Sequence, residues 1–489
     1  MYNSLKELTK HPVFHYFAEI SNIPRGSSNE KEISDYLVRF ARERNLEVIQ
    51  DAALNVIIKK PATPGYENVP TVIIQGHMDM VCEKNKGNNH DFNKDPLQLR
   101  IVGEMLYATD TTLGADNGVA VAYSLALLDS SNIPHPSLEV LITTEEETTM
   151  RGAHTVDPVH LEGKLLINVD SEEDRKLLVS SAGGVIVTQK IPIVWDNSPE
   201  NAVTYNLSIC GLQGGHSGIS IDKGRGNAVK LLGRVLYDLS NEFSYFIQEI
   251  NGGVKVNSIP REAQVMIQLH PDIVEKFFVK IEMWNRILKN ELRISDPEIN
   301  IILEPIETNV GKVFSKTTKE KAIAALMLIP NGVQSRSMEV EGLVESSTNL
   351  GVVNTYDTVI KYESETRSSI KSLKDSIINQ AQIITGMLGG DLSTDSDYPE
   401  WPYRAESKLR NLFEEAYKEK YGTDIEIIAV HAGIECGILV DKIPDLDAIS
   451  IGPDIFYVHT PNEHLSIPST LENWEYFLYT LKKMKNYHW

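Results

Sequence analysis

The sequence predicts an α/β protein in which a domain with a largely parallel central sheet flanked by helices is interrupted by an inserted α+β domain. The chain has 489 residues, more than the roughly 250–300 that one hydrophobic core usually accommodates. Short apolar runs alternate with helical patterns near both ends of the chain, which is typical of a parallel sheet. Between about residues 184 and 395 the runs instead alternate apolar and polar side chains, which is typical of strands with one exposed face.

Residues 1–183 are predicted to form the first part of the outer domain. Ser27–Val48 is expected to be a helix, because apolar side chains recur there at helical spacing and Ser28 or Asn29 can cap the first turn. The apolar stretch Gly118–Leu128 is expected to be a buried helix, because it is too short to span a bilayer. The runs predicted to be strands are "NVIIKK" (Asn55–Lys60), "PTVIIQG" (Pro70–Gly76), "SLEVLIT" (Ser137–Thr143) and "KLLINV" (Lys164–Val169).

Residues 184–395 are predicted to form the inserted domain. Alternating strands are expected in "AVTYNLSICGL" (Ala202–Leu212), "REAQVMIQLHP" (Arg261–Pro271) and "DTVIKYESET" (Asp357–Thr366), with helices around Asn227–Phe243 and Ile273–Asn290. The segments Val256–Pro271 and Thr348–Arg367 share a plan, in which an asparagine and a turn precede an alternating strand. This similarity favours an internal duplication of the inserted domain.

Residues 396–489 are predicted to return the chain to the outer domain. The stretch Asp395–Gly422 crosses a proline-containing boundary into a long amphipathic helix. After it, "IEIIAV" (Ile425–Val430) and "DAISIG" (Asp447–Gly452) restore the pattern of apolar runs.

Composition and charge argue against several classes of partner. The formal charge is −21 with a pI of about 5.1, and an acidic surface repels nucleic acid and anionic membranes, so neither is expected as a partner. The N-terminal residues lack the apolar core of a signal peptide. The widely spaced Cys82, Cys210 and Cys436 form no disulfide framework or zinc-knuckle pattern. A cytoplasmic location is therefore expected.

Side chains that bind metal ions follow several of the apolar runs. They are His77 and Asp79 after the run at 70–76, Glu145, Glu146 and Glu147 after the run at 137–143, Asp170 after the run at 164–169, His459 a short loop after the run at 447–452, and Asp116 just before the apolar helix. Ligands of open α/β sheets bind beyond the carboxyl ends of the strands. We therefore expect these side chains to meet at one edge of the sheet.

This set of side chains suits a pair of divalent cations. Taken as one ligand from each of the five positions, they give two histidines and three carboxylates without a thiolate, which favours zinc, with manganese and cobalt as alternatives. Two ions that share a carboxylate can hold a hydroxide between them and polarise a carbonyl oxygen. Each motif alone has an ordinary interpretation as a turn, a helix cap or a solvated charged run. Their occurrence together, at successive strand ends, is what predicts a metal centre.

The longest motifs resemble those of the aminoacyl-histidine dipeptidases (Xaa-His dipeptidases of the peptidase D type). These enzymes belong to the co-catalytic metallopeptidases, together with carboxypeptidase G and the aminoacylases. The resemblance covers nearly the whole chain and runs through "IPRGSSNE", "QGHMDMVCEKN", "LGADNGVAVA", "LINVDSEE", "HAGIECG" and "HTPNEH". It implies a catalytic outer domain, an inserted lid domain and two bound metal ions. The implied reaction is hydrolysis of small peptide substrates, notably Xaa-His dipeptides such as β-alanyl-histidine, by a metal-bridged hydroxide. A homodimer is compatible with the resemblance.

Matched position by position, the resemblance implies a role for each side chain at the strand ends. His77 and Asp170 hold one metal, Glu147 and His459 hold the other, Asp116 bridges both, Asp79 orients the His77 imidazole, and Glu146 is the general base. The triple glutamate leaves the register open, and the Gly152-Ala153 pair that follows selects Glu146 and Glu147. Thr149 stands where the wider family often has glycine.

Four further residues are implied to bind the substrate. They are His216, Asn257 and Arg367 of the lid and Gly433 of a binding loop in the catalytic domain. In this scheme Arg367 binds the C-terminal carboxylate of the substrate, and His216 stabilises the developing oxyanion. Two alternatives stay open. One is another amide hydrolase of the same family, such as a tripeptidase or an N-acyl amino acid deacylase. The other is an inactive binding protein on this scaffold, although the complete set of ligands with Glu146 argues against it.

Overall fold

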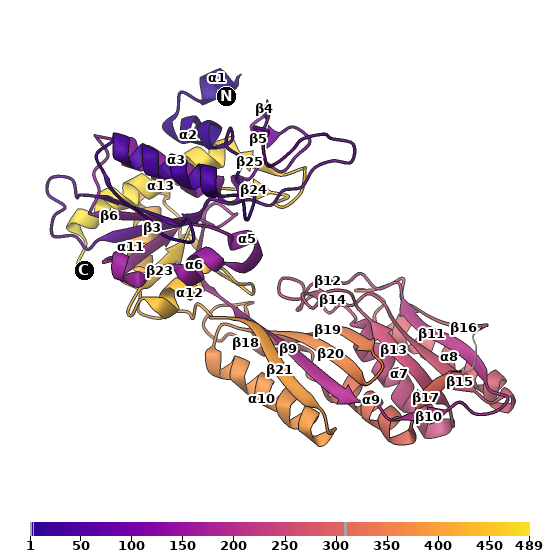
Figure 1. Cartoon of the computed structure of the whole chain (residues 1–489). Helices are drawn as coiled ribbons and strands as arrows, with labels where there is room; N and C mark the ends of the chain where they lie inside the picture. The colour runs from indigo at the N-terminus through magenta and orange to yellow at the C-terminus, as the bar shows by residue number, and fades with distance from the viewer. Residues whose placement is uncertain (1, 3, 308–310) are drawn as a thin grey trace. The chain divides into compact units, whose positions relative to one another are not determined.

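The computed structural model describes residues 2, 4–307 and 311–489. The chain forms two units (Figure 1). The first, which we call the outer unit, comprises the chain up to Ser180, Tyr403–Ala429 and Ile434–Trp489. The second, which we call the inserted unit, comprises Ser181–Pro402 and Val430–Gly433. The chain thus returns to the outer unit at Tyr403 rather than at residue 396. Gly433, which the sequence assigns to the catalytic domain, groups with the inserted unit.

An eight-stranded sheet forms the centre of the described outer unit. Its strands, in spatial order, are β1 (Glu47–Gln50), β2 (Val56–Lys60), β6 (Leu138–Thr143), β3 (Val72–His77), β7 (Leu165–Asn168), β23 (Asp447–Ser450), β8 (Lys176–Ser181) and β22 (Glu426–Val430). The central strands β6, β3, β7 and β23 run parallel to one another. The pairs β1–β2, β2–β6 and β8–β23 are antiparallel. The prediction of a largely parallel sheet is confirmed.

Helices cover both faces of this sheet. On one face they are α2 (Pro12–Ile20), α3 (Lys31–Glu43), α4 (Ala115–Asp129), α11 (Lys408–Tyr421) and α13 (Ile467–Lys483). Val72, Ile74 and Ile167 point to that face and share a buried core with these helices. The two-residue period of a strand turns Gln75 to the opposite face, where it contacts Glu435 of α12 (Glu435–Lys442). None of the described helices combines the length and the apolar character needed to cross a membrane.

The helix predicted over Ser27–Val48 is shorter than expected. Helix α3 begins at Lys31, with Glu30 rather than Ser28 or Asn29 at its N-cap. It ends at Glu43, because Asn45 adopts a φ of 55°, a left-handed conformation that terminates helices. Val48 therefore belongs to strand β1.

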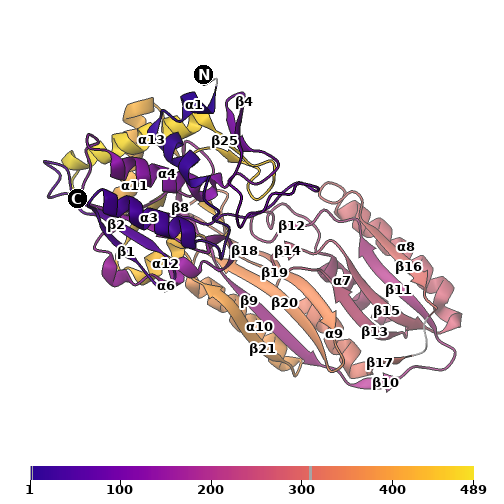
Figure 2. The ribbon, with the colours of Figure 1, turned by 45° about the horizontal axis from the view of Figure 1, so that its top comes forward.

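A nine-stranded sheet forms the described inserted unit (Figure 2). Its strands, in spatial order, are β16 (Asn300–Pro305), β11 (Val203–Cys210), β15 (Ala263–Leu269), β13 (Phe246–Gly252), β19 (Val344–Thr355), β20 (Val359–Ser368), β9 (Gly183–Pro192) and β21 (Asp391–Tyr398), with β18 (Gly332–Arg336) paired to β19. Its helices are α7 (Ala228–Glu242), α8 (Val274–Glu291), α9 (Lys316–Leu328) and α10 (Lys371–Met387). Neighbouring strands are antiparallel, as the alternating sequence pattern predicts.

The strand order of the inserted unit repeats. Numbered along the chain, the strands β11, β13, β15 and β16 lie in the order 4-1-3-2, and β9, β19, β20 and β21 lie in the same order counted from the opposite edge. The halves join through β13 and β19, where Gly252 pairs with Val353. The alternating strands of the two similar sequence segments are β15 and β20, which are the third strand of each half. The expected duplication is therefore present in the topology.

Replacing Ile74 with alanine is expected to lower the free energy of unfolding by about 2–5 kcal/mol, the usual cost of truncating a buried aliphatic side chain. Ile74 is fully buried in β3, the strand that ends at His77. The matched control is Ile294→Ala, because Ile294 is 85% exposed, and its effect should be near zero. Urea unfolding followed by circular dichroism measures both changes, and equal midpoints for the two variants would contradict this description of the core.

Candidate metal centre

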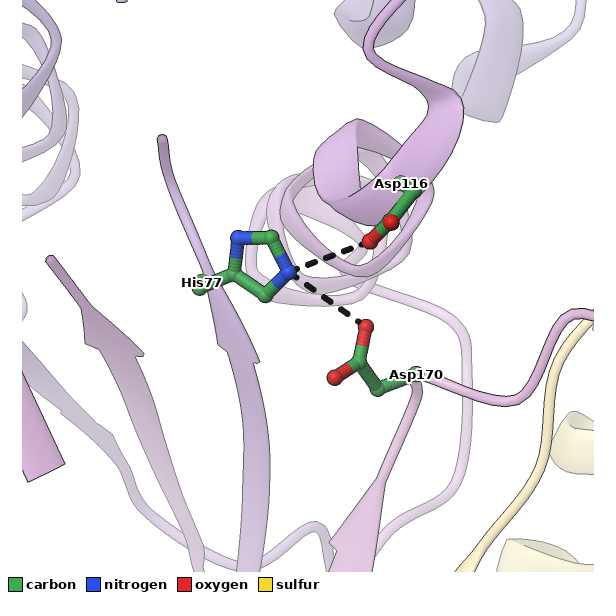
Figure 3. Close-up of side chains that lie close together, drawn as sticks. All are labelled: His77, Asp116 and Asp170. Carbon is green, nitrogen blue, oxygen red and sulfur yellow. Dashed lines mark hydrogen bonds and ion pairs between the residues drawn. The ribbon is translucent and has the colours of Figure 1, made fainter. Parts of the chain in front are cut away.

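Three of the predicted metal ligands meet beyond the carboxyl ends of β3 and β7 (Figure 3). His77 is the last residue of β3, Asp170 follows β7, and Asp116 lies in the first turn of α4. The Nε2 atom of His77 is 3.1 Å from Oδ1 of Asp116 and 3.5 Å from Oδ1 of Asp170. Because β3 and β7 are parallel neighbours, their ends bring these side chains to the same edge of the sheet.

The second group of ligands lies on the other side of the Asp116 carboxylate. The Nε2 atom of His459 is 3.1 Å from Oδ2 of Asp116 and 2.9 Å from Oε2 of Glu147. Each oxygen of Asp116 therefore faces a different imidazole, His77 through Oδ1 and His459 through Oδ2. This is the arrangement expected of a carboxylate that bridges two cations.

The three consecutive glutamates have different surroundings. Glu147 reaches His459, whereas the nearest Glu146 oxygen is 3.9 Å from Nε2 of His77. Glu145 forms an ion pair of 2.6 Å with Arg151 and is therefore engaged outside the group of ligands. Glu147 and Glu146 both lie near the candidate ligands and Glu145 does not, and the register that assigns metal binding to Glu147 stays a prediction.

Asp79 connects the end of β3 to the segment that carries the glutamates. Its main-chain oxygen is 3.2 Å from Nδ1 of His77, and its carboxylate Oδ1 is 3.4 Å from the same nitrogen. The carboxylate also accepts hydrogen bonds from the amides of Glu146 and Glu147, at 3.1 and 3.3 Å, and from the Ser27 hydroxyl at 2.8 Å. Asp79 thus fixes both the His77 ring, as expected of a partner of a ligating imidazole, and the backbone of the two glutamates.

Carboxylates outnumber imidazoles at this partly buried site, and the surroundings shift the pKa values of the carboxyl groups. Burial raises the pKa of Glu147 to about 7 and raises that of Asp170 above its ordinary value. Burial also acts on Asp116, but the hydrogen bonds from His459 and His77 outweigh it and lower the pKa of this carboxyl. Bound cations would compensate the excess negative charge, because a buried charge is costly unless it is paired or coordinates a metal.

The donor set fits metal ions. Ligand atoms within 4.8 Å of one another form three overlapping groups in the described residues: His77 with Asp116 and Asp170, His77 with Glu146 and Glu147, and Asp116 with Glu147 and His459. Imidazole nitrogen and carboxylate oxygen together suit zinc and neighbouring divalent metals. The first and third groups match the two ligand sets that the sequence predicts, with Asp116 common to both.

Several residues that hold these ligands in place were not singled out from the sequence. The Asn117 side chain accepts a hydrogen bond from the amide of His77 and donates one to the Val169 carbonyl, at 3.2 and 2.6 Å. It thereby joins the ends of β3 and β7. A side chain at Gly76 would collide with Asn117, which explains the glycine beside His77.

Two buried charged residues hold the loop before Asp116. The Glu463 carboxylate accepts hydrogen bonds from three successive amides, those of residues 113–115, at 2.7–3.0 Å. The Arg25 guanidinium donates to the carbonyls of Met78 and Gly114, at 3.0 and 2.5 Å. Both residues lie within motifs quoted above, "HTPNEH" and "IPRGSSNE", and this membership was the only signal of them in the sequence.

The four other predicted site residues belong to the inserted unit. Nδ1 of His216 accepts hydrogen bonds from the amides of Gly218 and Ile219, both at 3.2 Å, and the carbonyl of Asn257 accepts one from the amide of Ser217. Arg367 is buried and paired with Glu365, whose other oxygen accepts a hydrogen bond from the Ser217 hydroxyl. His216 and Arg367 are thus linked through neighbouring residues. A Cβ built on Gly433 would lie 2.5 Å from the ring of Tyr398.

Comparisons with known proteins find relatives over nearly the whole chain. Residues 73–483 match the model of Peptidase family M20/M25/M40. The chain is 36% identical over 482 residues to the cytosol non-specific dipeptidase of Escherichia coli strain K12, covering 99% of both chains. The crystal structure of the aminoacylhistidine dipeptidase from Vibrio alginolyticus superposes with a TM-score of 0.92 at 37% identity, covering 99% of this chain and 98% of that one.

More distant structures share only the fold. The aminopeptidase PepT from Bacillus cereus superposes with a TM-score of 0.55 at 15% identity, over 97% of this chain and 98% of that one. The family match covers most of the chain and includes every residue assigned above to the metal centre. The chain belongs to the peptidase family M20/M25/M40.

Proposed function

We propose that this protein is a metal-dependent dipeptidase that hydrolyses dipeptides with a free C-terminal carboxylate, notably Xaa-His dipeptides such as β-alanyl-histidine. The observation that carries the proposal is the position of Asp116, whose two oxygens face His77 and His459 separately. The names of the full-length relatives, a non-specific dipeptidase and an aminoacylhistidine dipeptidase, support the substrate class. The name of the Escherichia coli relative also supports a cytoplasmic location.

His77 and Asp170 would hold one divalent ion, Glu147 and His459 would hold the other, and Asp116 would contribute one oxygen to each. We propose zinc, because the donors are imidazoles and carboxylates. When bound, such ions lower the pKa of a water molecule toward ~7 and polarise the peptide carbonyl.

Glu146 is the proposed general base. Burial raises the pKa of Glu146 well above the ordinary value of a glutamate, which makes its carboxylate a stronger proton acceptor than an exposed glutamate. It accepts a proton from the attacking water at a carboxylate oxygen and later delivers it to the nitrogen of the leaving amine. The main-chain amide of Glu146 donates a hydrogen bond to the Asp79 carboxylate. This bond keeps the Glu146 side chain beside the candidate ligands.

His216 is the proposed oxyanion donor. Because its Nδ1 accepts two backbone amide hydrogen bonds, the ring proton must reside on Nε2. Burial, assisted by the charge of Arg367, lowers the pKa of His216, so the ring is neutral at physiological pH. A neutral imidazole with a fixed Nε2–H is suited to donate to a developing oxyanion.

Removal of divalent metals is expected to abolish dipeptide hydrolysis, and zinc, manganese or cobalt should restore it. Metal affinity should rise with pH, because the hydrogen bonds to Asp116 and Glu147 raise the pKa of His459 to about 11 and a metal must displace that proton. The measurement is metal content with parallel assays on dipeptides, tripeptides and acyl amino acids. Full activity of metal-free protein would refute the proposal, and preference for tripeptides or acyl amino acids would favour another amide hydrolase.

Glu146→Gln is expected to retain both metals and lose about 10²–10⁴-fold in kcat, because an amide cannot accept the proton. Glu147→Gln, a matched change at the next position, should instead weaken metal binding, because Glu147 contacts His459. Metal titration and kinetics on the two variants measure both effects. The opposite pattern, with metal lost only in Glu146→Gln, would show that the register is shifted by one residue.

Arg367→Ala is expected to lower kcat/KM for a free-acid dipeptide. The loss of transition-state stabilisation should be roughly 2–4 kcal/mol, the cost of removing one partner of a desolvated charge pair. C-terminally amidated dipeptides should be poor substrates of the wild type, and the substitution should change their rate of hydrolysis little. Arg367→Ala leaves the buried Glu365 carboxylate without its ion-pair partner. The double variant Arg367→Ala/Glu365→Gln therefore serves as the control for misfolding. Assays with β-alanyl-histidine and its amide decide the matter, and equal wild-type rates on acid and amide would exclude a carboxylate clamp.

A further inference from the structure

The guanidinium of Arg367 has a second buried partner besides Glu365. Its Nη1 donates a hydrogen bond of 2.6 Å to the phenol oxygen of Tyr398, and its Nη2 lies 2.7 Å from Oε1 of Glu365. Arg367 is 5% exposed, and its Nε has no hydrogen-bond partner among the described residues. Two sides of the planar group are therefore fixed by the protein, and other N–H donors are left over.

The phenol reaches Arg367 across a strand that has no side chain at this point. Arg367 on β20 pairs with Gly184 on β9, and Tyr398 on β21 pairs with the same Gly184 from the other side. A Cβ built on Gly184 would collide with the phenol oxygen of Tyr398. The backbone of Gly184 has no positive φ, so the need for glycine here is steric rather than conformational.

The backbone of Tyr398 is itself anchored. The register of β21 against β9 shifts between Asp395 and Tyr398, and such a bulge redirects the side chain that follows it. Lys374 of α10 is 1% exposed and donates to the carbonyl of Tyr398 at 3.1 Å and to the Asp397 carboxylate at 2.8 Å. A buried ammonium therefore holds the segment that presents the phenol.

Gly433 accommodates the same ring. A Cβ on Gly433 would lie 2.5 Å from Cε2 of Tyr398, so any larger residue there would displace the phenol. Two glycines, Gly184 and Gly433, thus leave room for one aromatic side chain, and this side chain contacts the arginine assigned to the substrate.

We infer that Tyr398 is the positioning residue that orients Arg367 for the C-terminal carboxylate of the substrate. This inference rests on the proposed function and adds a residue to it. A guanidinium held in one plane loses less conformational entropy when it binds a carboxylate through two hydrogen bonds. Tyr398 and Glu365 together supply that fixed plane, so loss of the phenol hydroxyl should weaken substrate binding more than it slows turnover.

The test is Tyr398→Phe, which removes only the hydroxyl. We expect KM for β-alanyl-histidine to rise about 5–20-fold, between the effect of losing an ordinary hydrogen bond and that of losing one to a charged group, with kcat within about twofold. Hydrolysis of the amidated dipeptide should not change. Gly184→Ala should reproduce this pattern, because it displaces the phenol without removing it. Tyr356→Phe, at a residue of the same unit that is 50% exposed, is the matched control and should behave as wild type.

A double-mutant cycle separates positioning from a structural role. In the Arg367→Ala/Glu365→Gln background, Tyr398→Phe should cause no further loss. The inference is overturned if Tyr398→Phe leaves KM unchanged while Arg367→Ala raises it, or if acid and amide substrates slow equally. If Gly184→Ala does not fold, the Tyr398→Phe kinetics decide. Failure of the wild type to hydrolyse dipeptides would instead refute the proposed function, and this inference with it.

Discussion

The carboxylate of Asp116 faces one imidazole with each of its oxygens, and much of the surrounding structure holds it there. Glu463 binds the three amides before it, Arg25 binds the carbonyl of Gly114, and Asn117 ties the ends of β3 and β7 together. A carboxylate shared by two metal ions would have little tolerance for displacement, because a shift toward one ion would be a shift away from the other. The hydrogen bonds that fix this loop are therefore what a bridging role of Asp116 would require.

Excess negative charge is the second constraint on the outer unit. Glu435 lies fully buried under the site, where its carboxyl accepts hydrogen bonds from Gln75 and Thr143, both at 2.5 Å. Burial raises its pKa to about 7, as it does for Glu147. Such a concentration of acids is unfavourable without compensation. Two bound divalent cations would compensate this negative charge, so metal binding should stabilise the fold of the outer unit.

Much of the outer unit and the gathering of candidate ligands at one edge of its sheet could be predicted from the sequence, because parallel strands buried on both faces have continuous apolar sequences and the polar residues at their ends stand out. The end of α3 could not, since it depends on the left-handed conformation of Asn45. Glu463 lies hundreds of residues from the amides it binds, and no local pattern reports such a contact. The same holds for Tyr398. It contacts Arg367 only because the residue that lies between them in the folded sheet, Gly184, has no side chain.

Anomalous diffraction from crystals of the metal-loaded protein tests the central claim most directly. The account predicts two metal peaks, one next to His77 and Asp170 and the other next to His459 and Glu147, each bound by a different oxygen of Asp116. A single peak, or two peaks bound by the same oxygen of Asp116, would contradict it.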